Sequence, residues 1–220
     1  AAGTAISMLL RDGLRPRVLE LADKTSIDHI RAKSRYRFPL NAGAIVLIEV
    51  DGEPETMGMM MERIGLRCDE LGALDVLAAT EPAERRAVWE ARRLISGSLK
   101  EAYRLKVNED ICVPRGRIVE MLARVDQVAA ETDLTIAVFG HAGDGNLHVN
   151  LLSHDDPADP AVQKHMWAAA RRVFEHTIAL GGTLSGEHGI GLTKRDYMHL
   201  EQSEQVLEWQ RRWKRMWDPQ

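Results

Sequence analysis

Two apolar segments separated by a glycine-rich stretch constrain the fold of this chain more than any other feature of its sequence. Residues 134–140 (LTIAVFG) and 147–152 (LHVNLL) each have the length and composition of a β-strand. The dipeptide Asp144-Gly145 between them is a turn signal, and the neighbouring glycines allow a tight connection. A connection this short joins antiparallel neighbours, so the two segments predict a β-hairpin.

Further strands and helices are expected along the whole chain, in an order that is mixed rather than strictly alternating. Residues 43–52 form a continuous apolar run bounded by glycines, which is typical of a central strand. The fold class that follows is α+β, with helices packed on one face of a largely antiparallel sheet. The remaining patterns predict strands at 15–23, 73–80 and 110–114 and helices at 1–13, 26–34, 53–72, 82–105, 115–133, 159–182 and 206–217.

The composition of the 220-residue chain is ordinary for a globular domain and argues against several classes of function. It has 29 lysines and arginines against 33 aspartates and glutamates, a formal net charge of −4, so nucleic acid is not an expected partner. Its two cysteines, Cys68 and Cys112, lie far apart and form no CxxC pattern, which suits a reducing compartment. The opening apolar stretch is too short to span a bilayer. We therefore expect a cytoplasmic protein.

The predicted hairpin carries two histidines, and strand alternation places both on one surface. His141 follows Phe139 on one face of the first strand, and His148 shares a face of the second strand with Asn150. Across a paired hairpin the two histidines come to roughly 5 Å at their Cβ atoms, which allows both rings to bind one metal ion. The hairpin therefore predicts two imidazole ligands and an amide on one surface.

A second glycine-rich segment, GGTLSGEHGIGLTKRD at residues 181–196, supplies the carboxylate that such a site requires. Two imidazoles seldom hold a catalytic metal without a carboxylate, and Glu187 is the candidate for the third ligand. His188 is then the candidate for a general base, since an imidazole titrates near neutral pH. The alternative is a hydrogen-bonded pair of His141 and His148 beside a capped turn, with no ion.

The last expected helix carries tryptophans on one face and basic residues elsewhere. Val206, Trp209, Trp213 and Met216 share the apolar face. Tryptophans interleaved with arginines also occur in proteins that bind single-stranded nucleic acid. A helix that buries its tryptophans and solvates its charges is the interpretation that the pattern favours.

Four motifs of the sequence resemble one known family. They are EDICVPRGRI at 109–118, GHAGDGNLHVN at 140–150, GGTLSGEHGIGLTKRDYM at 181–198 and WKRMWDP at 213–219. They look like the C-terminal domain of the FAD-linked oxidases that act on 2-hydroxy acids, and the resemblance covers nearly the whole chain. That group includes glycolate oxidase, D-lactate dehydrogenase and D-2-hydroxyglutarate dehydrogenase, within the vanillyl-alcohol oxidase superfamily.

The resemblance implies a fold, a cofactor and a missing part. Residues 1–220 are expected to form one ferredoxin-like cap domain, which closes over a flavin ring held by a separate N-terminal FAD domain. That FAD domain is absent from the sequence, as is the Asn-Pro-Gly-Lys stretch that usually follows the Asp-Pro found here at Asp218-Pro219. We therefore expect the sequence to be a piece of a longer protein and to be inactive alone.

Matched by position, the family's metal ligands and base fall on the candidates described above. His141, His148 and Glu187 match the ligands of a divalent metal, zinc or manganese, which grips the hydroxyl and carboxylate oxygens of the substrate. His188 matches the residue that takes the hydroxyl proton while the C2 hydride passes to the flavin.

The resemblance also implies residues that contact the substrate. Asn150 matches a substrate-contacting amide. Arg92 and Lys106 resemble the cations that hold substrate carboxylates, and Ser96 lies one helical turn after Arg92. A cation of this kind can instead pair with an acidic neighbour.

The predicted function is oxidation of a D-2-hydroxy acid, such as glycolate, D-lactate or D-2-hydroxyglutarate, to the 2-oxo acid by hydride transfer to flavin. The expected partners are the substrate, the protein's own FAD domain, and an electron-acceptor protein or subunit. Association with a membrane through such a partner stays open. Two alternatives stay open. One is a free-standing metalloenzyme with two histidines and one carboxylate, and the other is a non-enzymatic ferredoxin-like binding module.

Overall fold

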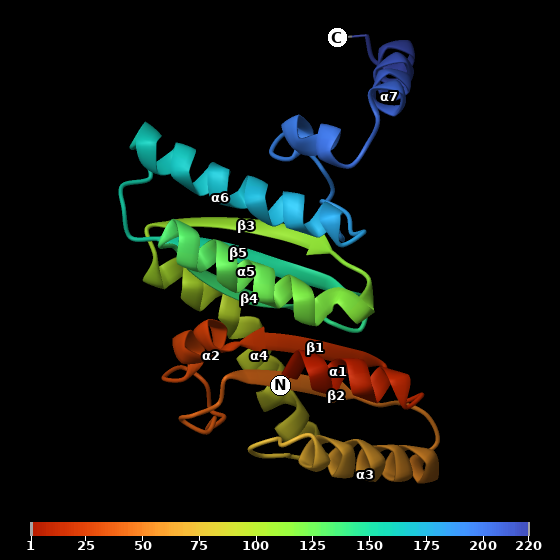
Figure 1. Cartoon of the computed structure of the whole chain (residues 1–220). Helices are drawn as coiled ribbons and strands as arrows, with labels where there is room; N and C mark the ends of the chain where they lie inside the picture. The colour runs from red at the N-terminus through yellow and green to blue at the C-terminus, as the bar shows by residue number, and fades with distance from the viewer. Residues whose placement is uncertain (1, 220) are drawn as a thin grey trace.

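The computed structural model describes residues 2–219 and contains a five-stranded sheet whose neighbouring strands are all antiparallel (Figure 1). The order across the sheet is β2-β1-β4-β5-β3. The predicted α+β class with an antiparallel sheet is confirmed. The strands are β1 (Val18–Asp23), β2 (Ala44–Glu49), β3 (Leu105–Cys112), β4 (Thr135–His141) and β5 (Asn146–Ser153).

Helices precede β1, follow β5 and lie in every connection between strands except the hairpin of β4 and β5. They are α1 (Ala2–Arg11), α2 (Lys24–Ile30), α3 (Pro54–Glu70), α4 (Pro82–Ala102), α5 (Ile118–Thr132), α6 (Pro160–Ala179) and α7 (Glu204–Trp217), with 3₁₀ turns at Arg115–Arg117 and Arg195–Leu200.

The part of the chain from β3 to α6 has the ferredoxin-like order of elements. β3 and β4 run parallel and are joined by α5, and β5 lies between them as an antiparallel neighbour of both. After α6 the chain returns to the free edge of β3, where Cys112 and Thr183 form an isolated bridge. The predicted hairpin is present, because β4 pairs with β5 from Thr135 opposite Leu152 to Phe139 opposite His148.

One face of the sheet, which we call the core face, packs against α1, α5 and α6. Alternate strand residues such as Val138 and Val149 point to this side and are buried with Phe174 of α6. In α5, Met121 and Val125 are four residues apart and both fully or almost fully buried in the same cluster, as expected for one face of a helix.

The opposite face, which we call the site face, carries a smaller apolar cluster and a group of polar side chains. Ile95 and Leu99 of α4 are buried there with Ala137 and Leu152. The prediction that all helices pack on one face therefore needs correction. The apolar stripe of α4 needs an apolar surface of its own, and the outward residues of β4 and β5 provide it.

Three strand predictions also differ from the structure. Residues 43–52 contain β2, but this strand lies at the edge of the sheet, with all its side chains half-buried. Contacts with α1 from one face and α2 from the other account for its unbroken apolar run. Residues 73–80 form no strand and run as an exposed connection from α3 to α4, where no neighbouring strand satisfies their backbone groups. The strand expected at 110–114 begins earlier, at Leu105.

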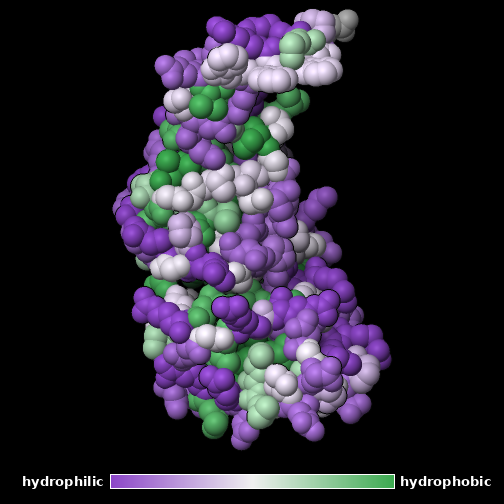
Figure 2. Space-filling view, turned by 90° about the vertical axis from the view of Figure 1, so that its right-hand side faces the viewer, coloured by the Kyte–Doolittle hydropathy of each residue, from purple (hydrophilic) through white to green (hydrophobic). Residues whose placement is uncertain are grey.

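α7 stands apart from the rest of the molecule (Figures 1 and 2), and none of its residues is buried. Trp209, Trp213 and Trp217 are 61%, 57% and 78% exposed. The prediction that this helix buries its tryptophans is therefore wrong for the part of the chain that the structure describes. The segment before α7 leads the helix away from the sheet, so the core cannot cover its apolar side.

Candidate metal centre

The two histidines predicted from the hairpin lie together on the site face. His141 is the last residue of β4, and His148 lies in β5 opposite Phe139. The two histidines are therefore diagonal neighbours, and their rings meet edge to face with centroids 5.4 Å apart. Strand alternation correctly placed both on one surface.

Glu187 brings a carboxylate to both rings. Its Oε1 lies 3.4 Å from Nε2 of His141 and 3.5 Å from Nε2 of His148. Two donor atoms bound about 2.1 Å from a tetrahedral zinc ion lie about 3.4 Å apart, so this spacing fits a single ion. Imidazole and carboxylate donors of this kind suit zinc or manganese.

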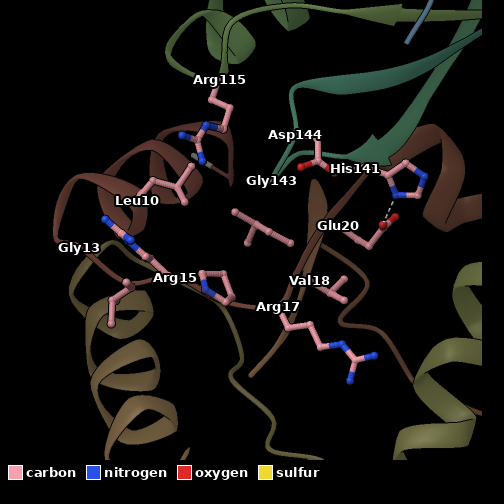
Figure 3. A pocket seen from close by; sticks show the side chains of 13 residues that line it. Leu10, Gly13, Arg15, Arg17, Val18, Glu20, Arg115, His141, Gly143 and Asp144 are labelled. Carbon is pink, nitrogen blue, oxygen red and sulfur yellow. Dashed lines mark hydrogen bonds and ion pairs between the residues drawn. The ribbon is translucent and has the colours of Figure 1, made fainter. Parts of the chain in front are cut away.

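The surroundings of the two histidines set their protonation. Burial lowers the pKa of His148 to about 4, so this ring is neutral near pH 7 and offers a lone pair. Burial alone would lower the pKa of His141, but the hydrogen bond and charge of Glu20 raise it above its usual value. Nδ1 of His141 and Oε1 of Glu20 form a hydrogen bond (Figure 3), and Nε2 of the same ring faces Glu187.

A buried aspartate holds the segment that carries Glu187. Oδ2 of Asp110 accepts hydrogen bonds of 2.9 Å from the backbone N–H groups of residues 186–188 and one of 3.1 Å from Oγ of Ser185. Oδ1 accepts from Nδ2 of Asn146 at 2.6 Å. Burial opposes ionisation of Asp110, but these hydrogen bonds outweigh it and hold its pKa well below the usual range. Asp110 therefore stays charged and fixes the backbone of this loop.

Two glycines of the motifs allow backbone segments to approach unusually closely. A Cβ atom at Gly186 would lie 1.6 Å from Nδ2 of Asn146, so a side chain there would break the loop's contact with β3 and β5. A Cβ atom at Gly145, whose φ is +81°, would lie 2.0 Å from the carbonyl oxygen of Val113. These glycines fix the hairpin turn and the loop in contact with the sheet.

A second anchor of the loop comes from Lys194, on the core face of the sheet. Its Nζ donates to the carbonyl oxygens of Asp110 at 2.6 Å and Leu184 at 2.7 Å, and lies 3.6 Å from Oε2 of Glu109. Burial lowers the pKa of Lys194 and raises the pKa of Glu109 to about 7. The loop is thus held from both faces, by Asp110 on one and by Lys194 on the other.

His188, the predicted general base, lies beside the candidate metal centre. Its ring stacks on that of His148, with centroids 5.3 Å apart and planes 14° from parallel. Its Nε2 is 4.0 Å from Oε1 of Glu187, and 47% of its side chain is exposed. A molecule that reaches Glu187 can therefore also reach this ring.

The predicted substrate amide, Asn150, is fully buried. Its Nδ2 donates to the carbonyl oxygens of Ala137 at 3.3 Å and His148 at 3.0 Å. Its Oδ1 has no hydrogen-bond partner among the described residues. Asn150 therefore supports the backbone beside His148 and keeps one polar atom unused.

Arg92, the first predicted substrate cation, is linked to the candidate metal centre through the carboxylate of Glu20. Its Nε donates to Oε2 of Glu20 at 2.6 Å, and its guanidinium lies 4.7 Å from the centre of the Phe139 ring. Glu20 therefore connects Arg92 with His141. Arg92 thus pairs with an acidic neighbour, which was the alternative to holding a substrate carboxylate that the sequence left open.

The other predicted substrate contacts, Ser96 and Lys106, touch each other. Nζ of Lys106 donates to Oγ of Ser96 at 2.8 Å and lies 3.3 Å from its carbonyl oxygen. Burial lowers the pKa of Lys106. Lys106 and Asp110 are an even number of residues apart in β3, so their side chains point to the same face of the sheet, the site face.

Three residues that shape the centre were not selected from the sequence: Glu20, Asp110 and Lys194. Charged residues are seldom fully buried unless they are paired. An acid inside an apolar strand, such as Glu20 in VLELAD or Asp110 in EDICV, is therefore a signal that could have found the first two. Their partners are not visible in the sequence, because Asp110 and Glu187 are 77 residues apart.

The whole sequence that carries this centre matches one family. Residues 1–220 match the family described as FAD linked oxidases, C-terminal domain. The chain belongs to this family. The resemblance drawn from the four motifs is thereby confirmed, and FAD is the cofactor with which the family's oxidases work.

Curated relatives of this domain include three kinds of oxidoreductase. The glycolate oxidase subunit GlcD of Bacillus subtilis is 33% identical over 219 residues, 100% of this chain and 46% of that protein. The D-lactate dehydrogenase of Anaerostipes hadrus is 32% identical over 84% of this chain and 40% of that protein. The D-2-hydroxyglutarate dehydrogenase of Stutzerimonas stutzeri is 32% identical over 69% of this chain and 33% of that protein. The chain spans less than half the length of these relatives.

A solved structure shares the fold of this FAD-linked oxidase domain. The 4-ethylphenol oxidase from Gulosibacter chungangensis superimposes with a TM-score of 0.65 over 97% of this chain and 48% of its own, at 14% identity. Within the described residues of the domain, no helix has both the length and the apolar character needed to cross a bilayer.

Proposed function

We propose that this chain is the substrate- and metal-binding domain of an FAD-dependent enzyme that oxidises a D-2-hydroxy acid to the 2-oxo acid. The observation that carries the proposal is the convergence of His141, His148 and Glu187 on one point in a domain of this family. The relatives named for glycolate, D-lactate and D-2-hydroxyglutarate support the substrate class.

These three residues would hold a divalent zinc or manganese ion, which as a Lewis acid lowers the pKa of a bound hydroxyl. The chain's own contribution is to prepare the ligands in advance. Glu20 fixes the ring of His141, burial keeps His148 neutral, and Asp110 holds the backbone of Glu187.

In the proposed reaction His188 accepts the proton of the substrate hydroxyl at a ring nitrogen. Its stacking on His148 orients the ring, and its exposed side leaves room for the substrate. FAD, held by a separate domain, would accept the C2 hydride, so that the substrate loses one proton and one hydride and leaves as the 2-oxo acid.

The cations of the site face would orient the substrate's carboxylate. Arg92 uses Nε for Glu20 and keeps its terminal guanidinium nitrogens as further donors. Lys106, held by Ser96, adds a second positive charge on the same face. Asn150 is fully buried, so it would act on the site indirectly, through the hydrogen bond from its Nδ2 to the backbone carbonyl oxygen of His148.

We assign the apolar side of α7 to the domain that holds FAD. The tryptophans of this helix are exposed in the described chain. The matched part makes up 46% of the Bacillus subtilis relative, so the part outside it is longer than the matched part. That length is enough for a further domain. An apolar helix face of this kind usually marks an interaction surface.

The test is the visible absorption spectrum of the protein joined to its own flavin domain, recorded without oxygen. We expect a flavin band that bleaches on addition of one of three acids, glycolate, D-lactate or D-2-hydroxyglutarate. The variant His148→Ala should lose this bleaching but keep the flavin band.

A matched control is His165→Ala, which removes an exposed histidine of α6 that lies outside the centre. This control should bleach as the wild type does. A folded flavoprotein that none of the acids bleaches would argue against the proposed reaction. Activity of the isolated 220-residue chain with added Fe(II) or Zn(II) would favour a free-standing metalloenzyme instead.

A further inference from the structure

A cavity of about 590 Å³ lies beside the metal centre, and no step of the proposed reaction uses it (Figure 3). It lies between the segment that leads into β1, the 3₁₀ turn at Arg115–Arg117, and the hairpin turn at Gly143 and Asp144. Its volume falls within the range of about 300–1,000 Å³ that is typical of small-molecule sites.

Three arginines line this cavity, and one of them is paired. Arg17 forms an ion pair with Glu49 at 3.7 Å and extends away from the other two in Figure 3. The side chains of Arg15 and Arg115 form no hydrogen bond or ion pair within residues 2–219. Figure 3 shows both guanidinium groups on the same side of the cavity, next to Leu10. Two guanidinium groups that are not neutralised by the described chain favour an anion on this wall.

The negative charges of the cavity lie on its other side, next to His141 (Figure 3). They belong to Glu20 and Asp144. Glu20 is already paired with Arg92 and His141. An anion is therefore attracted to the wall of Arg15 and Arg115, away from the metal centre.

Aliphatic side chains complete the lining and indicate the kind of anion. Leu10, Leu14, Val18 and Leu19 all border the cavity. An inorganic anion has no surface that gains from contact with these side chains, whereas the hydrocarbon part of an organic acid does.

We infer that this cavity is a binding site for an aliphatic organic acid, whose carboxylate is held by Arg15 and Arg115 and whose hydrocarbon part lies against Leu10 and Leu14. The site adjoins the metal centre without using the metal. The inference goes beyond the proposed function and does not depend on it, because binding here requires neither metal nor flavin.

The test is calorimetric titration of the 220-residue chain, freed of metal with EDTA, with glutarate at low ionic strength. We expect glutarate to bind, and Arg15→Gln and Arg115→Gln each to weaken its binding by about tenfold, as loss of a hydrogen bond to a charged group commonly does. Inorganic phosphate should bind more weakly than glutarate.

The matched control is Arg117→Gln, which removes the same charge from the same 3₁₀ turn. Arg117 does not line the cavity and pairs with Glu120 at 3.0 Å, so glutarate affinity should stay unchanged. Unaltered thermal unfolding of all three variants would show that they are folded.

Three results would overturn the inference: no binding of glutarate to the folded wild-type chain, equal weakening by Arg117→Gln, or phosphate binding as tight as that of glutarate. Failure of the flavin to bleach would leave this site unaffected, and failure of this site would leave the proposed reaction unaffected. The two proposals are therefore tested separately.

Discussion

Glu187 is the ligand of the candidate centre that comes from a loop, and half of its side chain is exposed. Replacing it with glutamine keeps the size and removes the charge. We expect Glu187→Gln to weaken zinc binding by more than the roughly 10- to 100-fold that loss of an outer-shell partner costs. Calorimetry of the 220-residue chain with Zn(II) measures this, and the unfolding temperature without metal should hardly change because the side chain is not packed.

A suitable control is Glu175→Gln, an exposed acid of α6 that pairs with Arg171 and with none of the three candidate ligands. Zinc affinity equal in wild type and Glu187→Gln would mean that the two histidines and this carboxylate do not form one site.

Glu109 makes the stability of the chain depend on pH. Its pKa is raised by burial to about 7 in the folded chain, against about 4.3 for an unperturbed glutamate. The folded state therefore holds the proton more tightly than the unfolded state. The stability that Glu109 contributes is present below about pH 4.3 and is lost as pH rises through about 7, with a slope of up to about 1.4 kcal/mol per pH unit.

The variant Glu109→Gln should lack this pH dependence. Urea unfolding between pH 5 and 8 measures the difference in free energy of unfolding between variant and wild type. The free energy of unfolding of the variant should increase relative to that of the wild type as pH rises. A difference that is constant over this range would show that the ion pair with Lys194 keeps Glu109 charged throughout.

At the scale of elements, the loop of residues 185–188 depends on the one carboxylate of Asp110. Asp110→Asn replaces a carboxylate that accepts four hydrogen bonds from this loop and one from Asn146 with a neutral amide. We expect a loss of about 2–4 kcal/mol in the free energy of unfolding, because three part-buried N–H groups lose their charged acceptor. Hydrogen exchange should accelerate at the amides of residues 186–188.

Asp196→Asn serves as the control for this loop, because Asp196 is exposed and lies a few residues further along the same segment. It should alter neither stability nor exchange. Unchanged protection of residues 186–188 in Asp110→Asn would show that other contacts, such as those of Lys194, are sufficient to hold the loop.

Some elements could be predicted from the sequence because their signal is local. The hairpin of β4 and β5 needs only two apolar runs and a turn, and its alternation places His141 and His148 on one surface. Residues 43–52 show the limit, since a run of apolar residues does not reveal whether a strand is central or at an edge. Residues 73–80 failed as a strand because pairing depends on a partner elsewhere in the chain.

The candidate centre, too, could be predicted from the sequence only in part. Its candidate donors lie in two motifs rich in histidine and glycine, and the sequence alone selected them. The residues that position these donors, Glu20 and Asp110, lie in other strands, and only the sheet order brings them close. The glycine content also had a structural cause that the sequence did not show, the contact of Gly186 with Asn146.

At the scale of the whole molecule, α7 is the element with the least support from its own chain. We expect the pair of substitutions Trp209→Ser and Trp213→Ser to leave the unfolding temperature of the 220-residue chain nearly unchanged, since both side chains are exposed. In the protein joined to its flavin domain the same pair should cost about 3 kcal/mol or more, as loss of a buried tryptophan does.

Thermal unfolding of both proteins gives this comparison, and each serves as the control for the other. Equal effects in the two proteins would show that α7 does not lie in the interface with the flavin domain. A large effect already in the 220-residue chain would mean that the helix packs on its own domain in solution.

The position of α7 also affects how the molecule can be observed. Three of the five tryptophans of the chain lie on this one helix, and all three are exposed. Most of the ultraviolet fluorescence of the domain should therefore come from indole rings in water. Docking of α7 against another domain would shift this emission to shorter wavelengths, and a nearby flavin would quench it. Such a shift would report, without any label, when α7 docks against another domain.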